Sequence, residues 1–200
     1  MKRMVAIVAA AVVVLLGLGT AGMVWVHADD DPGWGRHSLS TSGWMGGAGG
    51  MPHHSAVVTS EADYLIEMVA HHREAVAAAE ELSRSERPEM RAFGRDVVAT
   101  QSAQITSMEG WLAAWYPDER ADSAYEPMMR DLTALSGDAL DRVFLEDMIG
   151  HHMAAVMMSQ QLLVRGLDEH EAVGDLATKI RNDQMDEIRW MRAEWSTMGP

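Results

Sequence analysis

Apolar residues recur at helical spacing in four stretches of the chain after Thr59, and no alternating strand pattern competes with them. The first three predicted helices have recognisable ends: Ser60 and Asp63 resemble a capping box, Pro88 suits a first helical turn, and Gly166 suits a left-handed C-terminal residue. The predicted helices cover residues 60–83, 88–116, 137–165 and 169–197, and a long connection between the second and third could contain a short helix over 128–135.

The pattern occurs twice. YLIEMVAHHREAVAA, which begins at Tyr64, matches FLEDMIGHHMAAVMM, which begins at Phe144, at an offset of 80 residues. QSAQITSM, from Gln101, matches QMDEIRWM, from Gln184, at an offset of 83. One helical hairpin cannot cover its own apolar face, so two copies should pack together. The sequence therefore predicts an all-α, four-helix bundle over residues 59–198, with repeat one at 59–116, repeat two at 138–197 and an approximate twofold axis.

Residues 1–58 differ in character from the bundle. Lys2 and Arg3 precede a 23-residue apolar run, and Ala28 suits signal peptidase cleavage before Asp29. Residues 1–28 are expected to be a signal peptide or an uncleaved N-terminal membrane anchor, which places the remainder outside the cytoplasm in either case. Residues 29–58 are rich in glycine and are expected to form a flexible linker.

Composition excludes several classes of function. The formal net charge of −14 and the lack of a basic stripe argue against a nucleic-acid partner. The chain has no cysteine, so it has neither disulfides nor thiolate metal ligands. It does have 17 methionines, which makes thioether the only sulfur ligand that it can offer. No nucleophile with an adjacent base and no phosphate-binding glycine loop indicates a conventional enzyme.

The paired histidines are the main chemical feature. Neighbouring helical residues diverge by about 100 degrees, so the members of each pair should serve different faces. His72 and His152 fall in the core seam, whereas His71 and His151 fall on a flank. Each flank carries an acid one turn earlier, and these acids are potential ligands or partners that orient the histidines: Glu67 and Asp147.

A buried imidazole needs a partner, because an unsatisfied one costs roughly 1 to 3 kcal/mol. The partner could come from the protein, as a carboxylate, as an amide such as Gln101 or Gln184, or through trapped water. Symmetric packing could instead bring all four histidines to one region, where they would bind a metal ion. Imidazole and thioether groups outside the cell favour copper, as Cu(I) or Cu(II). The predicted metal residues are His71, His72, His151, His152, Met68, Met148, Met158, Glu67 and Asp147.

Two weaker alternatives concern metal chemistry. A ferritin-like metal oxidase is disfavoured because di-iron bundles normally carry Glu-x-x-His on two helices and a Glu on each of the others. Here the acids stand four residues before His71 and His151. Met51, His53 and His54 could form a looser site, although a solvated linker is the simpler interpretation.

The second histidine helix resembles the domain of unknown function 305 family. The residues that carry this resemblance are Phe144, Asp147, Met148, Ile149, His151, His152, Ala155 and Met158, followed by Gln184, Glu187, Ile188, Met191 and Trp195. The resemblance implies a ferritin-like four-helix bundle outside the cytoplasm, and some relatives, the CopM-type proteins, are associated with copper. Repeat one departs from the pattern, since Ala78 stands where the family motif has methionine.

Together these observations favour an extracytoplasmic protein, secreted or anchored by its N-terminal helix, that sequesters or transfers copper. The alternative from a different class is a metal-free helical interaction module with hydrogen-bonded core histidines and an unknown protein partner. A metal oxidase is the third hypothesis.

Overall fold

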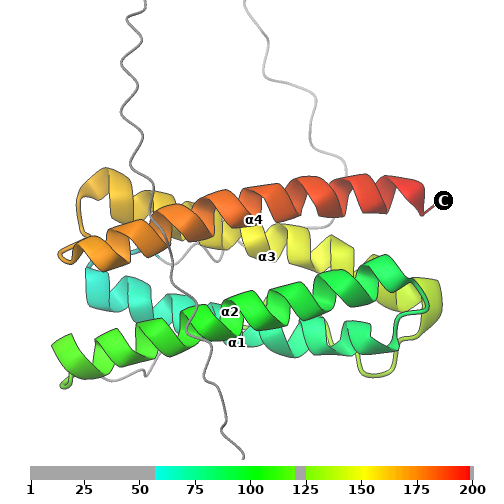
Figure 1. Cartoon of the computed structure of the whole chain (residues 1–200), viewed down its shortest axis with the longest axis horizontal. Coiled ribbons are helices and arrows are strands. Elements are labelled where there is room, and N and C mark those ends of the chain that lie inside the picture. The colour runs from blue at the N-terminus through cyan, green and yellow to red at the C-terminus, as the bar shows by residue number, and fades with distance from the viewer. Residues whose placement is uncertain (1–56, 120–124, 199–200) are drawn as a thin grey trace, which may run out of the picture. The chain divides into compact units, whose positions relative to one another are not determined.

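The computed structural model describes residues 57–119 and 125–198. Its elements are α1 (Glu61–Glu81), the short 3-10 helix η1 (Leu82–Arg84), α2 (Pro88–Trp115), α3 (Gly137–Arg165) and α4 (Glu171–Thr197), shown in Figure 1. The described ranges contain no strand, and the predicted all-α four-helix fold is confirmed. The leader at 1–28 and most of the linker lie outside the described residues. Within the described part of the chain, no helix is long and apolar enough to cross a membrane.

The helix ends follow the local signals in the sequence. The Ser60 hydroxyl accepts a hydrogen bond from the Asp63 amide at 3.1 Å, and the Asp63 carboxylate accepts the Thr59 amide at 2.8 Å. Pro88 is the first residue of α2. Gly166 ends α3 with φ of 61°, a left-handed conformation that glycine adopts without strain.

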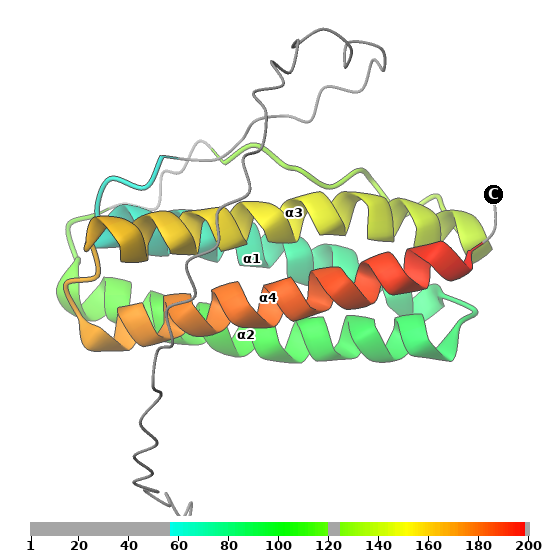
Figure 2. The same cartoon turned by 90° about the horizontal axis from the view of Figure 1, so that it is seen from above.

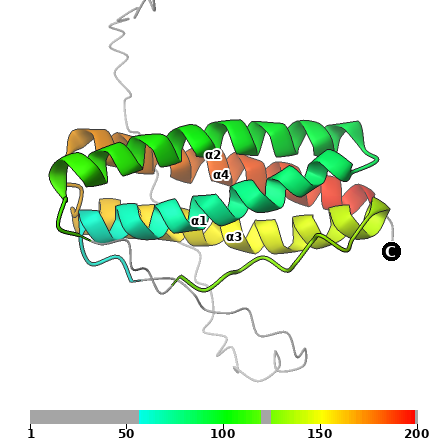
Figure 3. The ribbon, with the colours of Figure 1, turned by 90° about the horizontal axis from the view of Figure 1, so that it is seen from below.

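The two hairpins are joined by a crossover along the length of the bundle. Helices α1 and α4 run in one direction and α2 and α3 in the other (Figure 1). The chain must therefore return from the end of α2 to the opposite end before α3 begins. Figure 2 and Figure 3 show the described part of this connection running beside α3 and α1. This topology, with one long crossover, is that of ferritin-like bundles.

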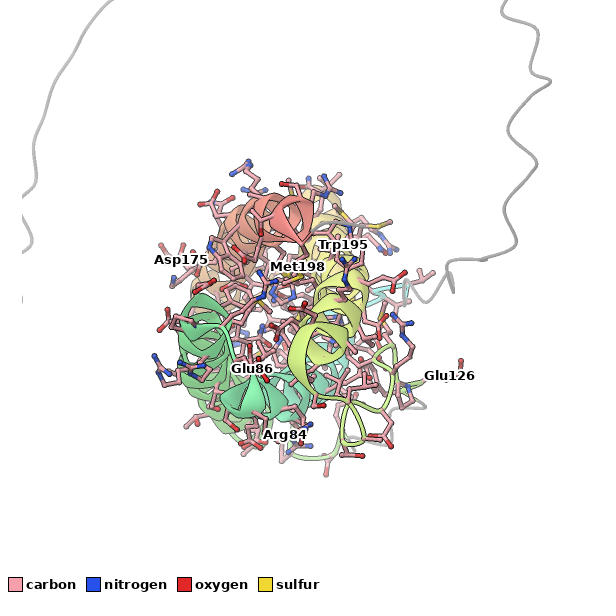
Figure 4. All side chains as sticks on the ribbon, turned by 90° about the vertical axis from the view of Figure 1, so that its right-hand side faces the viewer. Arg84, Glu86, Glu126, Asp175, Trp195 and Met198 are labelled. Carbon is pink, nitrogen blue, oxygen red and sulfur yellow. The ribbon has the colours of Figure 1, made fainter. Side chains whose placement is uncertain are left out.

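The crossover contains no helix over residues 128–135, so that expectation is wrong. The backbone amides of Met128 and Met129 donate to the Glu74 carboxylate on α1 rather than to a helical turn. Farther along, Arg84 donates to the carbonyl of Leu132 at 2.9 Å and to that of Leu135 at 2.6 Å. Arg84 is labelled in the end-on view of Figure 4, where side chains of the four helices fill the interior. Side chains of the bundle thus replace the hydrogen bonds that a helix would have made.

The apolar core is divided in two. One cluster contains Ala75, Val97, Met148 and Ile188, and the other contains Met68, Met108, Ala155 and Ile180. On each helix, buried polar side chains stand between a residue of the first cluster and a residue of the second. We call this set the central layer: His71, His72, Gln101, Gln104, His151, His152, Gln184 and the half-buried Glu187.

Buried carboxylates join the hairpins at both ends. Glu61, in the first turn of α1, accepts hydrogen bonds from the backbone amide and Nδ1 of His170, the N-cap residue of α4, at 2.8 and 2.7 Å. Asp141, near the start of α3, accepts the Ser85 hydroxyl at 2.9 Å and lies 3.6 Å from Nε of Arg87, the N-cap residue of α2. Each hairpin therefore holds the start of the other hairpin's second helix.

Helices α1 and α2 approach closely at Gly94. A Cβ atom there would lie 2.7 Å from the Ala79 carbonyl oxygen and 2.9 Å from the Leu82 Cβ. Both distances are shorter than ordinary van der Waals contact, and the first is to backbone, which cannot move aside as a flexible side chain can. The absence of a side chain at Gly94 sets the spacing of the first hairpin.

Candidate metal centre

All four histidines of the two pairs are buried, with relative exposures of 0 to 1%. The prediction that His72 and His152 face the core agrees with this. His71 and His151 are buried as well, because the flank on which they lie is the contact between α1 and α3. Their rings lie against each other there in a tilted arrangement, with centroids 3.6 Å apart and an interplanar angle of 37°. Packing of the two repeats therefore brings all four imidazoles into one layer.

The flank histidines are bonded across the α1–α3 contact. His71 Nε2 donates to the backbone carbonyl of His151 at 3.0 Å. His151 Nε2 donates to the Glu74 carboxylate at 3.1 Å, and the Tyr125 hydroxyl lies 3.4 Å from the same nitrogen. Because a carbonyl and a carboxylate only accept, both bonds place the proton on Nε2.

The seam histidines have partners on the second helix of their own hairpin. His72 Nε2 donates to the amide oxygen of Gln104 at 2.7 Å, and His152 Nε2 donates to the Glu187 carboxylate at 2.6 Å. Gln104 and Glu187 are equivalent positions of the repeat. The amides suggested by the sequence, Gln101 and Gln184, lie one turn away and do not bond to histidine; their buried amide atoms without partners are Gln101 Nε2, Gln101 Oε1 and Gln184 Oε1.

The other ring nitrogen is unpaired in every histidine of the layer. Nδ1 of His71, His72, His151 and His152 is buried and has no hydrogen-bond partner within the described residues. A neutral imidazole that donates through Nε2 carries a lone pair on Nδ1. The layer therefore holds four buried lone pairs of the kind that bind metal ions, each on a ring whose orientation is fixed by an Nε2–H bond.

Burial keeps the rings of His71, His72 and His151 in the neutral form. It lowers the pKa of His71 and His151 well below the ordinary value of 6.5, and the neighbouring imidazoles lower it further. Burial likewise lowers the pKa of His72 to about 4. Metal ions bind the deprotonated nitrogen, so at neutral pH no proton has to be displaced from these Nδ1 atoms.

The predicted methionine ligands are all buried but lie at different distances along the helices from the central layer. Met68 and Met148 are fully buried one turn before the histidines, and they belong to the apolar clusters on opposite sides of the layer. Met158 is 3% exposed and lies two turns beyond His151, among the residues of the second cluster. Met68 and Met148 therefore adjoin the layer, whereas Met158 is farther along α3.

The structure places the two predicted acids, Asp147 and Glu67, in surroundings that differ from the prediction. Asp147 accepts hydrogen bonds from the backbone amide and guanidinium of Arg130 on the crossover, at 2.7 to 3.0 Å. Glu67 is half-buried, and burial together with the charge of Asp63 raises its pKa. The carboxylates that reach the histidines are Glu74 and Glu187. Glu74 stands one turn after His71 on α1, but the histidine to which it bonds is His151 of the other hairpin, so spacing along the helix did not identify it.

The donor chemistry suits a soft cation. Imidazole nitrogen and thioether sulfur are the buried donors, and this combination favours Cu(I) over hard ions. Among the described residues, no three His, Asp or Glu side chains already form a metal-binding group. The layer therefore suits a cation with a low coordination number, or one whose binding reorients the imidazole rings. It fits a di-iron centre with four carboxylate ligands poorly.

Comparison with known proteins agrees with the fold. CopM in its Cu(II)-bound form is 26% identical, with a TM-score of 0.63 over 70% of this chain and 99% of that one. CopM in its Cu(I)-bound form is 27% identical, with the same score over 72% and 100%. A DUF305 fragment from Deinococcus radiodurans is 27% identical, with a TM-score of 0.61 over 70% and 98%.

No curated protein sequence matches the chain. The sequence model described as "Domain of unknown function (DUF305)" matches residues 61–195, which include the four helices except the last two residues of α4, and every histidine of the central layer. Its range covers more than half of the chain, and the solved relatives share the bundle. This chain therefore belongs to the DUF305 family.

Proposed function

We propose that this protein binds copper outside the cytoplasm, to sequester it or to transfer it, through Nδ1 atoms of the central layer. The observation that carries the proposal is the set of four buried, unpaired Nδ1 atoms. Eight ring nitrogens are buried in one layer, and only the Nε2 atoms have partners. A bound cation would satisfy lone pairs whose burial otherwise costs free energy.

The relatives support the choice of metal. CopM has been solved with Cu(I), Cu(II) and silver, and silver resembles Cu(I) in its preference for soft ligands. Met68 and Met148 adjoin the layer on opposite sides, so each can supply thioether to an ion held by the nearer imidazoles. His71, His72, His151 and His152 are the proposed nitrogen ligands. Glu74 and Glu187 would orient two of them, and we assign Met158, Glu67 and Asp147 a peripheral role.

The leader supports export. Its basic start, apolar run and cleavage-like end are those of a secreted or membrane-anchored protein. Outside the cytoplasm, the acidic charge of the chain attracts cations. A thiol-free site suits that compartment, because imidazole and thioether do not form disulfides there.

The test is an anaerobic titration of the purified full-length protein with Cu(I) against a chromophoric chelator. The variant with both His151→Ala and His152→Ala is expected to lose at least about tenfold in affinity, or about 1.4 kcal/mol. His170→Ala is the matched control, since His170 is the bundle histidine outside the layer. The pair His53→Ala and His54→Ala measures any contribution from the linker. Circular dichroism shows whether each variant remains folded.

Nitrogen NMR of the ring atoms identifies the ligand atom directly. With Ag(I), which is diamagnetic, the Nδ1 resonances of layer histidines should shift while Nε2 keeps its proton. Unchanged Nδ1 resonances under saturating metal, or wild-type copper affinity in the His151 and His152 variant, would refute the proposal.

The metal-free interaction module is the competing function, and two observations favour it. Every layer histidine already makes one hydrogen bond through Nε2. No three His, Asp or Glu side chains converge into a metal-binding group within the described residues. This alternative predicts that the same titration and spectra show no binding within the bundle.

A further inference from the structure

Glu74 is the point where the crossover meets the central layer. Its Oε2 accepts the His151 Nε2–H at 3.1 Å and also the Tyr125 hydroxyl. Its Oε1 accepts the backbone amides of Met128 and Met129, both at 2.8 Å. One half-buried carboxylate therefore serves a candidate ligand and three donors of the crossover at the same time.

We propose that Glu74 is a positioning residue that couples docking of the crossover segment 125–129 to metal binding by His151. The inference rests on the proposed function. Metal binding at Nδ1 fixes the imidazole ring, and the Nε2–H bond then fixes the carboxylate that holds the Met128 and Met129 amides. Conversely, when segment 125–129 is docked, its hydrogen bonds hold Glu74 in the position from which Glu74 orients His151. The coupling is reciprocal, because each event changes the free energy of the other by the same amount.

The remainder of the crossover has its own anchors. Arg130 binds Asp147, and Arg84 binds the carbonyls of Leu132 and Leu135. None of these contacts involves a histidine. Loss of the Glu74 carboxylate should therefore loosen the backbone at Met128 and Met129 and leave residues 130–135 in place. This difference within one segment serves as an internal control.

The repeat explains why the coupling acts at one histidine. Ala154 occupies the position equivalent to Glu74, so His71 has no corresponding carboxylate. His71 instead donates to the His151 carbonyl. His152 is oriented by Glu187, which makes no contact with the crossover among the described interactions. Glu187 therefore provides a carboxylate that orients a layer histidine without being coupled to the segment.

The experiment measures hydrogen exchange of the Met128 and Met129 amides in the full-length protein, with and without Ag(I). In the wild type, Ag(I) should slow exchange at these two amides severalfold and leave residues 130–135 unchanged. In Glu74→Gln, the two amides should exchange faster without metal, and Ag(I) should no longer protect them. Tyr125→Phe should have a partial effect, because it removes one of the four donors.

Two further variants separate positioning from a general loss of structure. Glu80→Gln makes the same change at an exposed site of α1 and should match the wild type in exchange and affinity. Glu187→Gln should lower Ag(I) affinity without accelerating exchange at Met128 or Met129. Substitution of a residue that orients a metal ligand typically costs 10- to 100-fold in affinity, and Glu74→Gln should show a loss of that order.

The outcomes distinguish the proposed coupling from the metal-binding function on which it rests. If wild-type protein binds Ag(I) through the layer but the exchange of Met128 and Met129 does not change, the coupling is wrong and the metal site stands. If Glu74→Gln leaves affinity at the wild-type value, Glu74 does not position His151. If no metal binds in the layer, both proposals are wrong, even where Glu74→Gln frees the segment.

Discussion

Acidification should destabilise the metal-free protein far more than an ordinary helical bundle. His71, His72 and His151 are held neutral in the fold, because burial lowers each pKa. In the unfolded chain these residues titrate near pH 6.5. Between that pH and the lowered values, which is about 4 for His72, the unfolded state binds more protons than the folded state. Stability is therefore complete above about pH 7 and falls as the pH decreases through this window.

The magnitude follows from the width of the window. Each histidine contributes about 1.4 kcal/mol per pH unit, so at pH 5 each costs roughly 2 kcal/mol relative to pH 7. Three such groups amount to roughly 6 kcal/mol, which is comparable with the total stability of about 5 to 15 kcal/mol of a typical domain. Glu67 and Asp141 act in the opposite direction, because burial raises their pKa values.

Urea unfolding followed by helical circular dichroism, at several pH values and with a metal chelator present, measures the effect. His72→Gln isolates one group from the opposing carboxylates, because a glutamine can bond to Gln104 but does not titrate. Its unfolding free energy should depend on pH less steeply than that of the wild type, by about 1.4 kcal/mol per unit. Equal stability at pH 5 and pH 7, or an unchanged slope in His72→Gln, would refute the assignment of neutral buried imidazoles.

Three further substitutions, two that test packing and one that tests a buried hydrogen-bond acceptor, are checked by thermal unfolding. Gly94→Ala should lower stability by about 1 to 3 kcal/mol, because the new methyl group meets backbone. Gly174→Ala should cost less, since the atom that it meets is the end of the flexible Asp168 side chain. Glu61→Ala should cost at least about 2 kcal/mol, because it leaves the amide and ring donors of His170 without their acceptor.

Local features of the sequence predicted the helices and their arrangement well. The capping residues Ser60 and Asp63, the first-turn Pro88 and the terminal Gly166 act within one turn of the chain, so their effect is readable without tertiary structure. The repeat predicted the approximate twofold arrangement, because equivalent residues must occupy equivalent positions in a symmetric bundle.

Contacts of the crossover were beyond the reach of the sequence. Asp147 was expected beside His151 because both lie on one face of α3, yet Arg130 of the crossover binds it instead. Glu74 binds His151 from the other hairpin, 77 residues away along the chain. Periodicity describes which face of a helix is buried, but it does not determine which side chain of a distant segment arrives there.

The two copies of the repeat have diverged in a way that bears on the site. The two carboxylates that bond to layer histidines both bond to histidines of α3: Glu74 to His151 and Glu187 to His152. The α1 histidines donate to neutral oxygens, namely a backbone carbonyl and the Gln104 amide. A carboxylate partner increases the basicity of an imidazole ligand more than a neutral oxygen does.

The α3 pair should therefore be the stronger half of any metal site in the layer. The α1 pair adds two further nitrogen donors, and the His71 ring, with its centroid 3.6 Å from that of His151, helps to exclude water from His151. The carboxylate partners of the α3 histidines agree with the DUF305 motif, which is more complete in the second repeat than in the first. The counterparts of Glu74 and Glu187 in the other repeat are Ala154 and Gln104, so both carboxylate partners serve histidines of α3 and the layer is not symmetric in charge.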